Sequence, residues 1–120
     1  MGRTNFIEHR GKRILHMNFT HLSPEELSDA IEEARPIIAS EPPHSILGLL
    51  DVTGTPVSKS IAASWKAFAA HNAPYINISA LVGVDGIKHI IFQAVINVTG
   101  RKNLILKSSF QEAKDWLADQ

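Results

Sequence analysis

Residues 46–59 read ILGLLDVTGTPVSK, and they are the most informative part of the sequence for the fold class. An apolar run ends at Asp51, the turn-rich segment VTGTP follows, and the pattern then changes to that of a helix. The apolar run predicts a buried strand over Ile46–Val52. A buried strand that leads through a polar turn into a helix is typical of open α/β sheets, which keep their functional residues at the carboxyl ends of strands. We therefore expect the functional end of the molecule at this junction.

Helices and strands alternate through the rest of the chain. The pattern predicts a helix over Ser58–Asn72, a strand over Tyr75–Val84, a helix over 85–99, a strand over Asn103–Lys107 and a last helix from Ser109. The helix over Ser58–Asn72 is expected to turn Ile61, Trp65, Phe68 and Ala69 inward. The last helix is expected to do the same with Phe110, Ala113, Trp116 and Leu117. The alternation over Tyr75–Val84 predicts one strongly apolar strand face, made by Ile76, Ile78, Ala80, Val82 and Val84.

A hairpin and a helix are expected at the start of the chain. Two short strands, Asn5–His9 and Arg13–Phe19, flank a basic turn in which Gly11 can supply the positive φ of a tight hairpin. Ser23 and Glu26 have the spacing of a capping box, which predicts that a helix begins there. The apolar stripe of this helix comprises Leu27, Ala30, Ile31, Ala34 and Ile38. Pro36 lies inside the helix and predicts a kink or an early stop, because proline removes a helical hydrogen bond.

This order of elements predicts an α/β protein with a single domain over residues 1–120. Repeated helix–strand alternation implies right-handed crossovers and a mostly parallel sheet, and the opening hairpin makes the sheet mixed. We expect about five strands and about four helices. A chain of this length fits one domain and can bury a real core without disulfides or metals.

Composition excludes several classes of function. Twelve basic and twelve acidic side chains cancel, so no overall charge directs the protein to nucleic acid. The absence of cysteine excludes disulfides and thiolate metal sites and suits a reducing compartment. The first residues contain no apolar segment of the kind found in secretory signals, and no run has the length of a membrane span. The sequence therefore predicts a cytoplasmic protein.

Two passages of the chain carry a resemblance to a known family. They are LLDVTGTPVSKSIAASWKAFAAHNAPYI, which starts at Leu49, and SALVGVDGIKHIIFQAVINVTGRKNLILKSSFQEAKDWLA, which ends at Ala118. With the order of elements, they resemble the STAS superfamily, which comprises the anti-sigma-factor antagonist domains and their relatives. The resemblance is closer to the SpoIIAA-like (STAS/SEC14-type) bacterial proteins of about this length. It implies the STAS-type fold and a regulatory domain.

The resemblance also points to a phosphorylation site. In the anti-sigma-factor antagonists the loop before the second helix carries an Asp-Ser-Ser-Gly motif, and a partner kinase phosphorylates its serine. Ser58 is the nearest positional match and Ser60 the next, while the aspartate and the glycine are both missing. A phosphate at a helix N-terminus would be stabilised by free backbone N–H groups. The alternative interpretation is that Ser58 is simply the N-cap.

Asp51, at the end of the predicted strand, has two interpretations as well. Its carboxylate either accepts hydrogen bonds from its own turn at Thr53 or orients a ligand.

The helix over 85–99 is apolar around most of its circumference. Ile87, Ile90, Ile91, Ala94, Val95 and Val98 form one stripe that is wide enough to face the core. Phe92 and Ile96 lie outside that stripe, one turn apart. Either a neighbouring helix covers them, or they form an exposed patch for a protein partner, a second copy or an apolar ligand.

Two functions are compatible with these patterns. The six histidines show no zinc spacing and no catalytic set can be assembled, so we expect no metal, no cofactor and no enzyme. The first hypothesis is a regulatory module that binds a protein partner or forms a homodimer. The alternative is a carrier or sensor of a small apolar or lipid-like ligand, as the SEC14 side of the resemblance implies. The candidate binding residues are Asp51, Thr53, Ser58, Ser60, Trp65, Phe68, Phe92 and Ile96.

Overall fold

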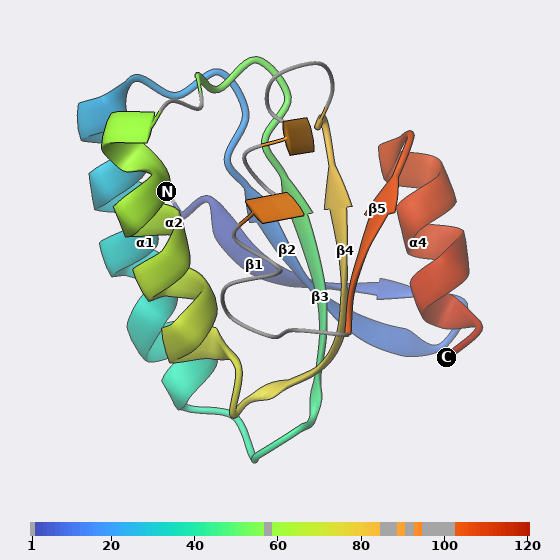
Figure 1. Cartoon of the computed structure of the whole chain (residues 1–120). Helices are drawn as coiled ribbons and strands as arrows, with labels where there is room; N and C mark the ends of the chain where they lie inside the picture. The colour runs from blue at the N-terminus through green and yellow to red at the C-terminus, as the bar shows by residue number, and fades with distance from the viewer. Residues whose placement is uncertain (1, 57–58, 85–88, 91–92, 95–102) are drawn as a thin grey trace.

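A five-stranded sheet forms the centre of the molecule, with the strands in the order β1-β2-β3-β4-β5 (Figure 1). The computed structural model describes residues 2–56, 59–84, 89–90, 93–94 and 103–120. The strands are β1 (Thr4–His9), β2 (Lys12–Asn18), β3 (Ile46–Asp51), β4 (Ile76–Val82) and β5 (Leu104–Lys107). β1 is antiparallel to β2, and the pairs β2–β3, β3–β4 and β4–β5 are parallel. The expected α/β domain with a five-stranded mixed sheet is therefore confirmed.

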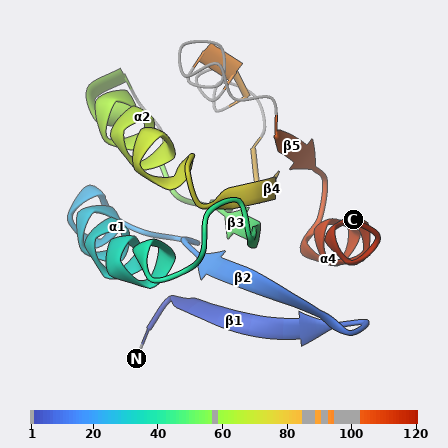
Figure 2. The ribbon, with the colours of Figure 1, turned by 90° about the horizontal axis from the view of Figure 1, so that it is seen from below.

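Helices cover both faces of the sheet (Figure 2). α1 (Pro24–Ala39) and α2 (Lys59–Asn72) lie side by side on one face, and α4 (Phe110–Ala118) lies on the other. The expected helix over 85–99 falls mainly outside the described residues, although residues 89–90 and 93–94 are helical. No helix in the described parts of the chain is long and apolar enough to cross a membrane.

Local signals account for the ends of the first elements. Arg10 and Gly11 both have positive φ, 52° and 79°, which is the requirement of a two-residue turn between β1 and β2. At the start of α1, the Ser23 hydroxyl accepts a hydrogen bond from the Glu26 amide, and the Glu26 carboxylate accepts one from the Ser23 amide. The predicted hairpin and capping box are thus both confirmed.

Of the two effects expected of Pro36, a kink or an early stop, the early stop is wrong, because α1 continues past Pro36 to Ala39. Proline costs the helix one hydrogen bond near its end, whereas Ile38, two residues later, is completely buried. Burial of that side chain favours continuation, since tertiary packing supplies most of the stability of a helix in a protein. The helix ends at Ser40, whose amide and hydroxyl both donate to the Pro36 carbonyl.

Two cores lie on either side of the sheet. The larger one is between the sheet and the α1/α2 layer, and it contains Phe19, Trp65 and Phe68, with Phe19 and Phe68 stacked at 5.8 Å between ring centroids. The smaller one lies under α4, where Ala113 and Leu117 are fully buried. The inward-facing positions predicted for α1, α2 and α4 all belong to these cores, which confirms the helical periodicity.

One prediction for β4 needs correction. Ile76 was expected to share a face with Ile78 and Ala80, but it packs in the α1/α2 core while those two residues pack under α4. The cause is an irregularity in the β3–β4 ladder, where Ile46 pairs with Ile76 but Leu47 pairs with Ile78. One extra residue on one strand moves the side chains before it to the other face.

Charged and polar contacts hold α4 to the tip of the hairpin. His9 Nε2 lies 2.7 Å from Asp115 Oδ1, Arg10 lies 3.5 Å from the same oxygen, and Lys12 Nζ donates to the carbonyl of Gln120. The hydrogen bond from His9 is the main reason that the pKa of Asp115 is lowered, and the charge of Arg10 acts in the same direction. These contacts join the C-terminal helix to the opposite end of the sequence.

Asp115→Asn is expected to reduce the acid sensitivity of the fold. A carboxyl whose pKa is lowered by folding stabilises the protein above its unfolded pKa of about 4, and that contribution is lost as the pH falls through the lowered pKa. Urea midpoints measured between about pH 5 and pH 2 should therefore change less steeply in Asp115→Asn than in the natural chain. Asp119→Asn is the control, because no ion pair is formed by Asp119 among the described residues. Equal slopes for the natural chain and Asp115→Asn would contradict the prediction.

Candidate functional site

The loop after β3 is a closed turn, and Asp51 closes it. Asp51 Oδ1 accepts hydrogen bonds from the amide and from the hydroxyl of Thr53, at 3.0 and 2.6 Å. The carboxylate of Asp51 therefore makes the bonds of its own turn, which is the structural interpretation of this residue. Thr53, predicted as a binding residue, is exposed and acts as the other half of the same turn.

This loop is also tied to the chain that follows β2. The buried hydroxyl of Thr55 donates to the Phe19 carbonyl and accepts from the Leu22 amide, at 3.0 Å for the latter. The His21 amide donates to the Thr53 carbonyl at 2.9 Å. These bonds satisfy the backbone where the carboxyl ends of β2 and β3 meet, so the loop is fixed by the fold rather than free to close over a ligand.

The remaining loop and third-helix candidates cannot be placed. Ser58, Phe92 and Ile96 lie outside the described residues, and Ser60 is described only as part of the α2 backbone. Phosphorylation of Ser58 therefore stays a prediction. Two residues of the core-facing stripe expected for 85–99 are described, Ile90 and Ala94, and both differ from expectation because they are exposed. The side chain of Ile90 is large and apolar and has 68% of its surface exposed.

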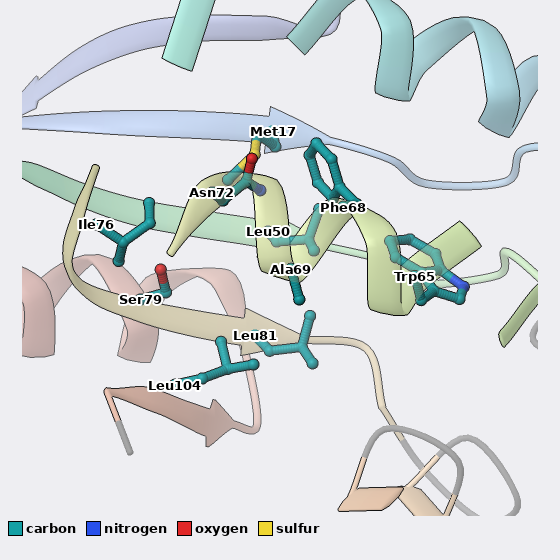
Figure 3. Close-up of a pocket in the computed structure, with 10 residues that line it drawn as sticks. All are labelled: Met17, Leu50, Trp65, Phe68, Ala69, Asn72, Ile76, Ser79, Leu81 and Leu104. Carbon is teal, nitrogen blue, oxygen red and sulfur yellow. The ribbon is translucent and has the colours of Figure 1, made fainter. Parts of the chain in front are cut away.

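An apolar pocket lies between α2 and the sheet, and it contains two predicted site residues (Figure 3). Trp65 and Phe68 reach it from α2, and strands β2 to β5 supply the opposite wall. The cavity has a volume of about 40 Å³ and is partly open to solvent. Its lining residues are Met17, Leu50, Trp65, Phe68, Ala69, Asn72, Ile76, Ser79, Leu81 and Leu104.

Two polar side chains line this pocket, and the sequence did not single out either. Asn72 ends α2 and Ser79 lies in the middle of β4, and each has only 5% of its surface exposed. In Figure 3 the hydroxyl of Ser79 points from β4 toward the α2 side. Asn72 Oδ1 lies 2.9 Å from His71 Nδ1, which leaves the Asn72 Nδ2 group for other partners. A signal was present in the sequence: Ser79 is one of two polar residues in β4, with Asn77, and it lies in the middle of the strand between apolar residues.

Gly48, on β3, pairs with Ser79 in the sheet. A Cβ atom at position 48 would lie 2.9 Å from Ser79 Oγ and 3.6 Å from both Ile76 Cδ1 and Met17 Cε. The glycine therefore leaves space beside the hydroxyl that any other residue would fill.

The opposite face of the sheet, under α4, carries the half-buried side chain of His16. The rings of His16 and Phe110 are 4.8 Å apart at a tilt of 52°. Burial lowers the pKa of His16, the negative charge of Asp51 opposes this, and the positive charge of Lys114 adds to the lowering. A neutral imidazole in contact with an aromatic ring is a packing group. Among the described residues, no three His, Asp or Glu side chains lie close enough together to hold a metal ion.

Known proteins do not extend this description. No protein-family model, no curated protein and no solved structure matches the chain. The STAS resemblance therefore stays a prediction, and the arguments for function rest on the described geometry. Of that geometry, the pocket between α2 and the sheet is the feature with the chemistry of a binding site, because its apolar wall encloses a small number of polar groups.

Proposed function

We propose that this chain is a non-enzymatic binding module whose pocket between α2 and the sheet takes one end of a small, mainly apolar molecule. The observation that carries the proposal is the pocket itself, with two aromatic side chains on one wall and aliphatic side chains on the other. Apolar walls with a few polar groups are the usual composition of small-molecule sites. This function corresponds to the carrier or sensor hypothesis.

The size of the pocket restricts what enters it. A volume of about 40 Å³ holds about three water molecules, whereas an engineered cavity that binds benzene has about 150 Å³. A bulky ring system does not fit without movement of the walls. The pocket is partly open, so an elongated molecule can insert a narrow end and leave the rest at the mouth.

A pair of substitutions on one helix tests the proposal. Ala69 lines the pocket, and Ala70, the next residue of α2, is exposed and does not line it. Ala69→Leu places three more carbon atoms in the pocket and is expected to weaken binding of 1-hexanol by about tenfold or more. Ala70→Leu is expected to leave that binding unchanged. The dissociation constants are measured from backbone amide shifts during NMR titration, and equal constants for the two variants would contradict the proposal.

A regulatory module that binds a protein partner or a second copy is the second candidate. One observation favours it: Ile90 is a large apolar side chain with most of its surface exposed. Such a side chain is suited to be one anchor of an interface. Native mass spectrometry of the gently purified protein separates the candidates. A retained small molecule supports the binding module, whereas a ligand-free dimer that is lost in Ile90→Glu supports the interaction module.

The STAS resemblance adds three expectations to this proposal. It supports a mostly parallel sheet with a fourth helix over 85–99, a phosphorylated serine at Ser58 and a cytoplasmic location. Incubation with kinase-containing bacterial extract tests the phosphorylation. Label in the natural chain that disappears in Ser58→Ala would support it, whereas equal label in both would oppose it.

A further inference from the structure

We infer that the pocket selects an uncharged head group that carries an oxygen atom, and that Ser79 and Asn72 are the residues that recognise it. This inference rests on the proposed function and adds the chemical class of the ligand. It starts from a polar end of the pocket, where Figure 3 shows Asn72, Ile76 and Ser79 apart from Trp65 at the other end. The apolar part of the ligand would lie toward Trp65 and Leu81.

The polar groups at this end have unused hydrogen-bonding capacity. Among the described residues, neither the Ser79 hydroxyl nor the Asn72 Nδ2 group has a hydrogen-bond partner. Each residue has only 5% of its surface exposed, but neither polar atom is among the fully buried atoms that lack a partner, so both remain accessible to water. A ligand group that enters the pocket can therefore take the place of water as the partner of these two atoms. Both groups line the same pocket, which gives that partner its place.

The number of donors defines the head group. The Asn72 Nδ2 group only donates, and the Ser79 hydroxyl can donate one hydrogen and accept another. A ligand oxygen can accept a hydrogen bond from either residue, and a hydroxyl can in addition donate to Ser79. Alcohols, ketones and amides have such an oxygen.

The absence of charge in the lining excludes ions. No Asp, Glu, Lys or Arg is among the described residues that line the pocket. An ion that leaves water for an apolar pocket without an opposite charge loses its hydration and gains no partner. A carboxylate or an ammonium group with the same tail is therefore expected to bind much more weakly than the alcohol.

Three probes and one substitution test this inference. The probes are 1-hexanol, hexanoate and n-pentane, titrated into the natural chain and into Ser79→Ala while backbone amide shifts are followed by NMR. Ser79→Ala should weaken the binding of 1-hexanol by about tenfold, because one hydrogen bond is lost, and should leave the binding of n-pentane unchanged. Hexanoate should bind the natural chain at least about tenfold more weakly than 1-hexanol. Ser45→Ala is the control, because its hydroxyl donates to Pro42 outside the pocket.

The outcomes separate this inference from the proposed function. If neither n-pentane nor 1-hexanol shifts amides around the pocket, the proposed function fails. If both bind but Ser79→Ala and Asn72→Leu each bind 1-hexanol as tightly as the natural chain does, the pocket stands and the inference fails. The ligand-free stability of Ser79→Ala gives a further readout. An unchanged or raised urea midpoint fits a hydroxyl without a partner, and a clear fall would overturn the inference.

Discussion

Gly83→Ala is expected to destabilise the fold by about 4 kcal/mol. Gly83 has a φ of 88°, in the left-handed region that strains any side chain, and a Cβ atom there would lie 2.4 Å from the Thr53 amide nitrogen and 2.6 Å from its Cα. The contact is with backbone, which cannot rotate away as a long side chain can. The loop after β3 would have to move, and with it the hydrogen bond from the Thr53 amide to Asp51. Urea unfolding monitored by circular dichroism measures the loss.

Gly11→Ala is the matched control for this prediction. Gly11 has nearly the same φ, 79°, but nothing lies within 4 Å of the position of its Cβ. Its substitution carries only the backbone strain, which we expect to cost about 1 kcal/mol. Similar losses for the two variants would show that the close approach of Gly83 to Thr53 contributes nothing.

Thr55→Val is expected to destabilise the fold by about 3 kcal/mol. Valine keeps the shape of threonine and removes the hydroxyl, which leaves the Phe19 carbonyl and the Leu22 amide without their side-chain partner. Thr55, Phe19 and Leu22 are all at most 1% exposed, so water does not replace the lost bonds. Each buried polar group left unpaired costs about 1–3 kcal/mol. The free energy of unfolding in urea is again the measurement.

Thr53→Val provides the comparison within the same loop. It also removes a hydroxyl from a β-branched side chain, but the hydrogen bond from Thr53 to Asp51 is exposed to solvent. Water can take its place, so we expect a loss of about 1 kcal/mol or less. If Thr55→Val costs no more than Thr53→Val, the tie between the β3 loop and the chain after β2 is not a major source of stability.

Local signals were sufficient for most of the fold. The capping box at Ser23, the turn glycine at Gly11 and the 3.6-residue apolar periodicity of α1, α2 and α4 each concern residues close together in sequence. The physical forces that they represent act within one element, so they can be recognised before the partners of that element are known. The same periodicity placed Trp65 and Phe68 inside, where they became part of the pocket wall.

The failures have a different origin. The face on which Ile76 lies depends on the irregular pairing of β4 with β3, and the continuation of α1 beyond Pro36 depends on the burial of Ile38. Exposure of Ile90 could not be read from the apolar stripe, because a stripe does not show whether anything covers it. In each case the deciding contact is with another element of the fold.

The type and order of the elements could be predicted from local patterns, because hydrophobic period, capping and turn chemistry are properties of neighbouring residues. The place of the candidate site depends instead on how the elements pack together. Asn72 at the end of a helix and Ser79 in the middle of a strand acquire a shared pocket when α2 packs on the sheet. Gly83 comes close to Thr53 only because β3 and β4 are neighbours. Such contacts depend on packing between elements, which no local pattern specifies.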